Sequence, residues 1–213
     1  MLNTLFIGVT LTLFPIIQLP DWKYSEKTLA THEISLSNRQ PSSYVNGVFK
    51  DNILLNIDYL SGVVQPPTQM NWYMVRQPKM VEFKLNPNET FAFHDDVLSQ
   101  YQGAVTKTTN AHFNSTEGFK SDGYLVGDGV CHLASLINWT ARDAGLISYA
   151  PTNHNFANIA EIPKQYGTSI YYYPGRAYTN QKQNLYVTNN FQKTITFRFE
   201  YKGDKLKVTI VES

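Results

Sequence analysis

The chain has 213 residues, of which 42% are hydrophobic and only 16% charged, and its formal net charge is +1. This length suits one compact domain with a sizeable hydrophobic core. The near-neutral charge excludes the strongly basic surface that is typical of nucleic-acid binding. A single cysteine excludes an internal disulfide and any cysteine-rich zinc site. We expect no cofactor.

The first 20 residues form an apolar segment unlike the rest of the chain. They predict a signal peptide or short membrane anchor over residues 1–20, and hence an extracytoplasmic protein, secreted or anchored in the cell envelope. The apolar run is shorter than the roughly 20 residues that span a bilayer. No Lys or Arg precedes it and no small-residue cleavage site follows it. The alternative is therefore a buried terminal strand or helix.

Residues 21–44 are polar and show no sustained period, so we expect a linker or a loosely attached entry segment there and a single domain over residues 45–213. Apolar residues at helical spacing predict a helix over residues 49–60. Gly62 stands where that helix should end, because glycine readily adopts the left-handed conformation of a C-terminal cap. The segment Gln65-Pro66-Pro67 predicts a break after it.

The middle of the chain predicts a strand, a long loop and a second helix. Apolar and polar residues alternate over 81–85, and extended chain resumes at 91–93 after a turn. Residues 99–129 are rich in Gly, Thr and Asn, as loops that shape binding sites often are. From Val130 to Gly145 an apolar helical face follows, with Asp128 as the expected N-terminal cap.

The last third of the chain is rich in predicted strands. Residues 169–173 and 184–187 have strand composition, and the segments 195–201 and 206–210 alternate on either side of a turn, which predicts a hairpin. These elements together predict an α+β fold, in which a mostly antiparallel sheet packs with a few helices.

The only cysteine, Cys131, falls in the first turn of the predicted second helix. A helix N-terminus favours negative charge, so we expect the pKa of this thiol to lie below its usual value of about 8.5. The backbone N–H groups of Gly129, Val130 and His132 are candidates for an oxyanion hole. The alternative is a small buried apolar residue, since free cysteine is among the most buried residue types.

A cysteine nucleophile needs a base, and His154 is the candidate. It follows the predicted helix in a loop, and a cysteine at a helix start with a histidine from a later segment is typical of cysteine acyl-transfer enzymes. His132 is adjacent to Cys131, but successive helical residues point about 100° apart, so we expect it to face elsewhere. Asn153 or Asn155 could orient the imidazole of His154, and either could equally be a turn former.

Metal binding is a rival interpretation of the histidines. The possible ligands are His94, Asp95, Asp96, His112, His132 and His154. No pair of them has the tight spacing of a zinc site, so we expect no metal.

Residues 83–211 resemble the VanW domain of bacterial cell-envelope proteins. The family's central motif is a glycine-rich run followed by Val or Ile, Cys and a Ser/Ala-rich helix, and it is similar to the stretch Gly127–Ser135 here. Four further elements match in order, and they are residues 85–94, His154-Asn155, residues 163–170 and residues 184–189. The chain departs from the family pattern at His132, where the family has glutamine, at His94, where it has asparagine, and near Gly167, where it has an acid.

The resemblance implies L,D-transpeptidation of peptidoglycan, with Cys131 as nucleophile and His154 as base. In this interpretation a Cys131 thioester forms 3→3 cross-links between stem peptides, and Asp128, Tyr124 and His94 are candidates for the substrate groove. The partners expected are peptidoglycan stem peptides and, through residues 1–20, a membrane, with no nucleic acid and a monomeric chain. Two alternatives stay open: a cysteine peptidase or amidase on cell-wall peptides, and a non-catalytic wall-binding or scaffolding module.

Overall fold

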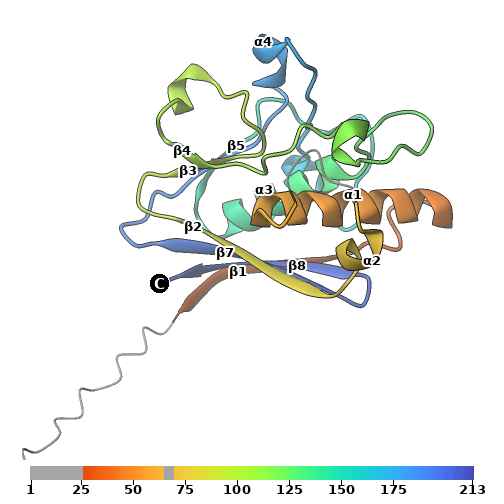
Figure 1. The fold of residues 1–213 in the computed structure, drawn as a ribbon. Helices are drawn as coiled ribbons and strands as arrows, with labels where there is room; N and C mark the ends of the chain where they lie inside the picture. Colours follow the sequence, from red (N-terminus) through yellow and green to blue (C-terminus); the bar gives the residue numbers. More distant parts are fainter. Residues whose placement is uncertain (1–25, 65–69) are drawn as a thin grey trace, which may run out of the picture.

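A computed structural model describes residues 26–64 and 70–213 and shows an α+β fold with two four-stranded sheets (Figure 1). The larger sheet is antiparallel throughout and has the order β1 (Lys27–Ser35), β8 (Lys205–Glu212), β7 (Ile195–Lys202), β2 (Lys79–Leu85). The smaller sheet has the order β4 (Val105–Lys107), β3 (Thr90–Ala92), β6 (Tyr186–Thr188), β5 (Ile147–Tyr149). Only its β3–β4 pair is parallel. The predicted fold class is therefore confirmed.

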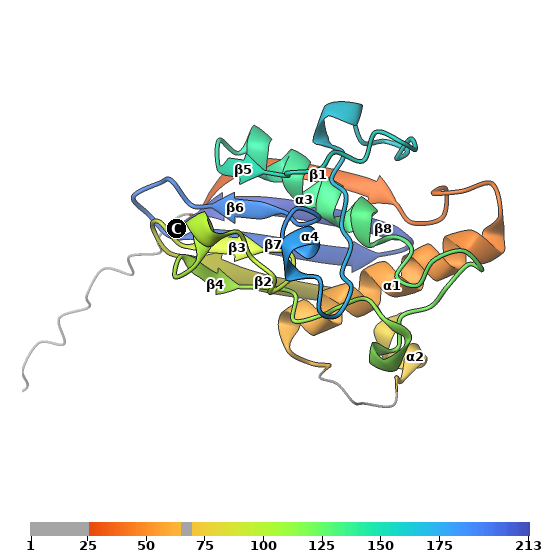
Figure 2. The same ribbon diagram turned by 90° about the horizontal axis from the view of Figure 1, so that it is seen from above.

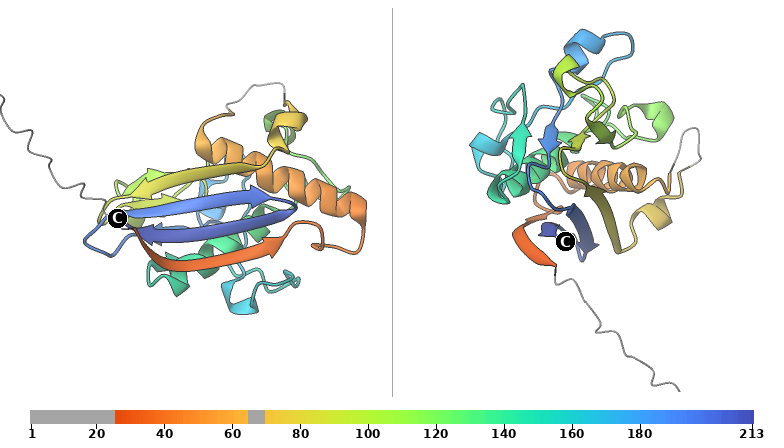
Figure 3. Two further views of the ribbon diagram at one scale, coloured as in Figure 1. Left: turned by 90° about the horizontal axis from the view of Figure 1, so that it is seen from below. Right: turned by 90° about the vertical axis from the view of Figure 1, so that its left-hand side faces the viewer.

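Two long helices, α1 (Ser43–Ser61) and α3 (Val130–Asp143), lie on the same face of the larger sheet (Figures 2 and 3). Their apolar side chains and the inward residues of β7 and β8 form one hydrophobic core. The remaining elements are short, namely the helices α2 (Trp72–Val75) and α4 (Ala177–Asn180) and the 3-10 turns η1 (Ser99–Tyr101), η2 (Ser115–Glu117) and η3 (Lys164–Tyr166).

The other face of the larger sheet is polar, as period-two alternation along β7 and β8 requires. Figure 3 shows this face without a covering helix. Cross-strand ion pairs lie on it: Arg198 contacts Glu82, and Lys207 contacts Glu200. The β7–β8 turn places Gly203 and Asp204 at positive φ angles of 56° and 62°, as a tight two-residue hairpin needs. The predicted hairpin is confirmed.

Both predicted long helices are confirmed, with longer bounds for the first. The side chain of Ser42 accepts a hydrogen bond from the backbone N–H of Val45 at the start of α1. Gly62 ends α1 with a φ of 77°. No helix within residues 26–64 and 70–213 is long and apolar enough to cross a membrane. The segment 1–20 and the break at 65–67 lie outside the described residues.

The prediction of a linker or loosely attached entry segment over residues 21–44 was wrong for residues 27–35. Residues 27–35 form β1, which pairs with β8 at the edge of the larger sheet. Ile34 is the only residue of β1 that is fully buried, so this strand carries almost no apolar alternation. An edge strand of this kind is stabilised by its backbone ladder, which leaves little trace in composition.

The prediction of a strand over residues 169–173 was also wrong. The segment pairs with no strand among the described residues. Its backbone N–H groups donate instead to loops and side chains: Ser169 to the carbonyl of Thr152, and Tyr171 to the carbonyl of Gln183. Residues 169–173 therefore have the amino-acid composition of a strand, but no strand pairs with them within the described residues.

Candidate active site

The start of α3 depends on two glycines in the left-handed region. Gly127 and Gly129 have φ angles of 88° and 101°, and Gly129 is the N-terminal cap. A Cβ atom on Gly129 would lie 2.8 Å from the carbonyl oxygen of Phe49 in α1, so only glycine lets the two helices approach. Asp128 does not cap the helix as predicted. Its Oδ2 accepts a hydrogen bond from the N–H of Asp122, which closes the preceding loop.

Cys131 is the second residue of α3 and is half-buried. Its thiol lies against the backbone of Ile170: the S–H donates to the Ile170 carbonyl at 3.5 Å, and the Ile170 N–H donates to Sγ at 3.4 Å. Burial raises the pKa of the Cys131 thiol to about 11, and the negative charge of Asp128 adds to the rise although the Ile170 N–H opposes it. The prediction of a lowered thiol pKa was wrong, because desolvation outweighs the helix N-terminus.

A cavity of about 460 Å³ joins Cys131 to both neighbouring histidines, since Cys131, His132 and His154 all line it. Its walls come from the end of the 99–129 loop, the start of α3, the loop after His154 and the segment 169–172. Gln40, just before α1, and Phe49, within α1, also line it. The structure thus brings the two predicted catalytic residues to one cavity from segments far apart in the chain.

His154 is buried, and its Nδ1 lies 3.2 Å from the carbonyl oxygen of Ala157. A carbonyl can only accept, so Nδ1 carries the proton and Nε2 is the basic nitrogen. Burial lowers the pKa of His154, while the Ala157 carbonyl acts in the opposite direction. The imidazole is therefore neutral near pH 7. The ring of Phe156 packs on it with centroids 4.0 Å apart.

The Ala157 carbonyl accepts the hydrogen bond from Nδ1 of His154, which in other cysteine enzymes goes to an orienting side chain. Asn153 donates instead to the carbonyl of Lys164 at 3.2 Å, and Asn155 is exposed with no side-chain hydrogen bond to a described residue. The group that orients His154 is therefore the backbone carbonyl of Ala157, and neither of the two predicted asparagines does so.

His132 does not face away from the site, as its position after Cys131 predicted. Its ring lies 6.2 Å from that of His154 and 4.9 Å from that of Phe49, and it lines the same cavity. Burial lowers the pKa of His132 to about 3, and the charge of Arg39 adds to this effect. Its buried Nδ1 has no hydrogen-bond partner within the described ranges. His132 is thus a second neutral imidazole at the site.

Two of the three predicted oxyanion donors are already engaged. The N–H of Val130 donates to the carbonyl of Gly127 at 3.2 Å, and that of His132 donates to the carbonyl of Gly129 at 3.0 Å. Among the residues that the structure describes, the N–H groups of Gly129 and Cys131 have no acceptor. They are the donors that an oxyanion could use.

Of the three residues predicted to line the substrate groove, only Asp128 lines the cavity. Asp128 lines the cavity, whereas Tyr124 is 92% exposed and lies outside the lining. His94 is fully buried: its Nε2 donates to the carbonyl of Gln183 at 3.1 Å, and its pKa is lowered by burial to about 4. Tyr124 and His94 are therefore not part of this groove.

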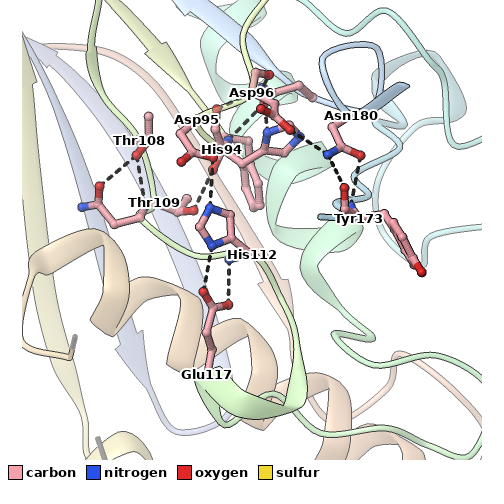
Figure 4. A network of polar contacts seen from close by, with 12 residues as sticks. His94, Asp95, Asp96, Thr108, Thr109, His112, Glu117, Tyr173 and Asn180 are labelled. Atoms are coloured by element: carbon pink, nitrogen blue, oxygen red, sulfur yellow. Dashed lines mark hydrogen bonds and ion pairs between the residues drawn. The ribbon is translucent and has the colours of Figure 1, made fainter. Parts of the chain in front are cut away.

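His112, next to His94 in space, bridges two carboxylates (Figure 4). Its Nε2 lies 3.0 Å from Oδ1 of Asp95, and its Nδ1 lies 3.0 Å from Oε1 of Glu117. The hydrogen bond to Asp95, which has the larger effect, and the hydrogen bond to Glu117 raise the pKa of His112 to about 10. A histidine that donates from both nitrogens has no lone pair for a metal. No group of three metal-binding side chains occurs in residues 26–64 and 70–213.

A buried ion pair, not foreseen from the sequence, anchors the loop that follows His154. Arg39 has a fully buried side chain, which donates to Glu161 at 2.7 Å and to the carbonyl of Ala160 at 2.7 Å. Glu161 also accepts from the N–H of Ser35 at 2.7 Å. Residues 35–39 thus fix one end of the cavity wall. No local motif could have revealed it, because the partners stand 122 positions apart.

The sequence model of the family described as "VanW like protein" matches residues 74–211, which is more than half of the 213 residues. The chain belongs to the VanW family. Comparison with curated proteins and with solved structures returned no match. VanW membership associates the chain with the bacterial cell wall, and the matched range includes the predicted stretch 83–211.

Proposed function

We propose that this VanW protein is a cysteine acyltransferase of the cell wall, and specifically an L,D-transpeptidase that forms 3→3 cross-links in peptidoglycan. The observation that carries the proposal is that the only thiol of the chain lines one cavity with two neutral imidazoles, those of His132 and His154. Family membership supports the cell-wall substrate, and the cavity volume of about 460 Å³ is that of a small-molecule or peptide site.

In the first half-reaction Nε2 of His154 takes the Cys131 proton as sulfur attacks the carbonyl carbon of the third residue of a donor stem. The C–S bond forms, the C–N bond to the terminal D-alanine breaks, and His154 returns the proton to the leaving amine. The N–H groups of Cys131 and Gly129 stabilise the tetrahedral oxyanion.

In the second half-reaction the side-chain amine of another stem attacks the thioester. His154 accepts the proton that this amine loses, the C–S bond breaks, and the proton returns to the sulfur of Cys131. A thiol with a raised pKa and a histidine with a lowered pKa are both neutral before substrate binds. Proton transfer is therefore coupled to attack, in contrast to the preformed thiolate–imidazolium pair of other cysteine enzymes.

Purified protein incubated with disaccharide tetrapeptide tests the proposal. We expect 3→3 dimers, released D-alanine and, by mass spectrometry, a covalent adduct on Cys131. Cys131→Ala should abolish all three, whereas Tyr124→Ala, exposed and outside the cavity, should retain them. Equal dimer formation by the wild type and Cys131→Ala would contradict the proposal.

Hydrolysis instead of transfer uses the same residues, and the same assay separates the two. Release of D-alanine with tripeptide monomers and no dimers would identify a peptidase. A non-catalytic wall-peptide module is favoured by one observation, the thiol held by Ile170 with its pKa raised to about 11. Stem-peptide binding that is equal in the wild type and Cys131→Ala, without any adduct, would select that alternative.

A further inference from the structure

The backbone hydrogen bonds of the segment from Ser169 to Tyr173 alternate as they do in an extended chain, and one edge of the segment is bonded at every second residue. The N–H groups of Ser169, Tyr171 and Tyr173 donate to Thr152, Gln183 and Asn180, respectively. Thr152 and Gln183 are themselves in contact through their side chains, so these acceptors lie on one side of the segment. In an extended chain, alternate residues direct their backbone groups to opposite sides.

Ile170 and Tyr172 therefore present their backbone groups to the opposite side. For Ile170 this is observed directly, because both its N–H and its C=O contact Sγ of Cys131. Tyr172 lies two residues after Ile170, so its backbone groups lie on the same edge. Within the described residues its N–H has no acceptor and its C=O has no donor. Ser169, Ile170, Tyr171 and Tyr172 all line the cavity that holds Cys131 and His154.

We propose that the edge on which the backbone groups of Tyr172 are free binds the substrate as an added β-strand, with one residue of an extended stem peptide exchanging both backbone hydrogen bonds with Tyr172. An antiparallel pair of this type satisfies an N–H and a C=O at once. The bound chain then runs past Ile170, where the sulfur of Cys131 is held. The inference rests on the proposed function for the identity of the peptide.

The charge of the cavity agrees with this occupant. Asp128 is the only lining residue with a formal charge at neutral pH, and it makes no ion pair within the described ranges. A stem peptide whose third residue is a diamino acid brings a side-chain ammonium to this carboxylate. A polyanionic wall polymer would bring the wrong charge.

Backbone hydrogen exchange tests the proposed edge directly. The experiment uses Cys131→Ser protein, to prevent turnover, and the synthetic tetrapeptide L-Ala-γ-D-Glu-L-Lys-D-Ala as the probe. At saturating peptide we expect exchange of the Tyr172 amide to slow at least tenfold. The Tyr171 amide, already bonded to Gln183, should be unchanged and serves as the internal control. Binding detected by calorimetry without a change at Tyr172, or no binding at millimolar peptide, would overturn the proposal.

A pair of variants isolates the N–H group. Tyr172→Pro removes the N–H and the side chain, whereas Tyr172→Ala removes only the side chain. We expect Tyr172→Pro to bind the tetrapeptide about tenfold more weakly than Tyr172→Ala, as the loss of one hydrogen bond implies. Equal affinities in two folded variants would contradict the proposal, and if Tyr172→Pro does not fold, the exchange result decides.

The outcomes also separate this inference from the proposed reaction. Protection of the Tyr172 amide without dimer formation by the wild type would support the edge and refute transpeptidation. Full cross-linking by Tyr172→Pro would support transpeptidation and refute the edge.

Discussion

The thiol of Cys131 makes two hydrogen bonds with the backbone of Ile170: it donates to the Ile170 carbonyl and accepts from the Ile170 N–H. This double contact joins the first turn of α3 to the segment 169–173. The hydroxyl of Ser135, one turn further along α3, accepts from the N–H of Thr168 and extends the same junction. Cys131 and the proposed substrate edge are therefore joined by hydrogen bonds from two successive turns of α3.

The reactivity of the free thiol should be low at neutral pH. Because burial raises the pKa of Cys131 to about 11, we expect the alkylation rate by iodoacetamide to rise about tenfold per pH unit from pH 7 to near 11. Cys131 is the only thiol, so mass spectrometry reports it without ambiguity. The same protein in urea provides the control, with a rate that levels off above pH 8.5 or so. An identical pH profile for folded and unfolded protein would contradict the burial effect.

The bridge made by His112 should stabilise the fold in a pH-dependent way. The pKa of His112 is about 10 in the folded chain, against an ordinary value near 6.5, so its contribution is complete below pH 6.5 and is lost as pH rises through 10. We expect His112→Gln to reduce the free energy of unfolding by about 1–3 kcal/mol at pH 6.5. The deficit should shrink towards pH 10.5, as measured by urea denaturation. A deficit independent of pH would show that His112 is not charged in the native state.

The ion pair between Arg39 and Glu161 should respond asymmetrically to removal of either partner. Glu161→Gln leaves the fully buried guanidinium without a counter-charge, for which we expect a loss of about 3–5 kcal/mol. Arg39→Met leaves Glu161, whose side chain is 39% exposed and can be solvated, so the loss should be smaller. Urea denaturation of both variants and of the double variant checks this order. A larger loss for Arg39→Met would contradict the burial argument.

Gly129 should be much harder to replace than a positive-φ glycine whose surroundings are open. Gly129→Ala meets two costs, the positive φ of 101° and the Phe49 carbonyl 2.8 Å from the new Cβ, and we expect a loss of about 2–4 kcal/mol. Gly123→Ala is the matched control, because its φ of 114° imposes strain while the space around it is open. Thermal unfolding of the two variants should show the larger decrease for Gly129→Ala. Equal decreases would mean that the contact with α1 is not limiting.

The regular elements with a strong apolar period could be predicted from the sequence. The helix ending at Gly62, the helix containing Cys131 and the final hairpin all bury a continuous face, and burial is what makes a pattern visible. Strand β1 was not predicted because all of its residues except Ile34 are exposed or half-buried. The segment 169–173 was wrongly predicted as a strand because it has the composition of a strand, although no strand pairs with it among the described residues.

For the site, the residue types could be predicted but not their environment. The sequence pattern predicts Cys131 at a helix start, yet the pKa of its thiol depends first on burial and then on Ile170, which lies 39 positions away, and on Asp128. The orientation of His132 depends on Phe49 in another helix. Such long-range contacts carry no local signal in a single sequence, and they decide whether a thiol or an imidazole is charged.

Gln40 and Phe49 line the cavity, and both precede residue 74, where the family match begins. The chain before residue 74 also supplies β1, which covers the edge of β8, and α1, whose apolar side chains fill the core. A fragment cut at the family boundary would open the pocket on one side and leave a long strand edge free to aggregate. The smallest unit that keeps this cavity intact is therefore longer than the range 74–211 that the family match covers.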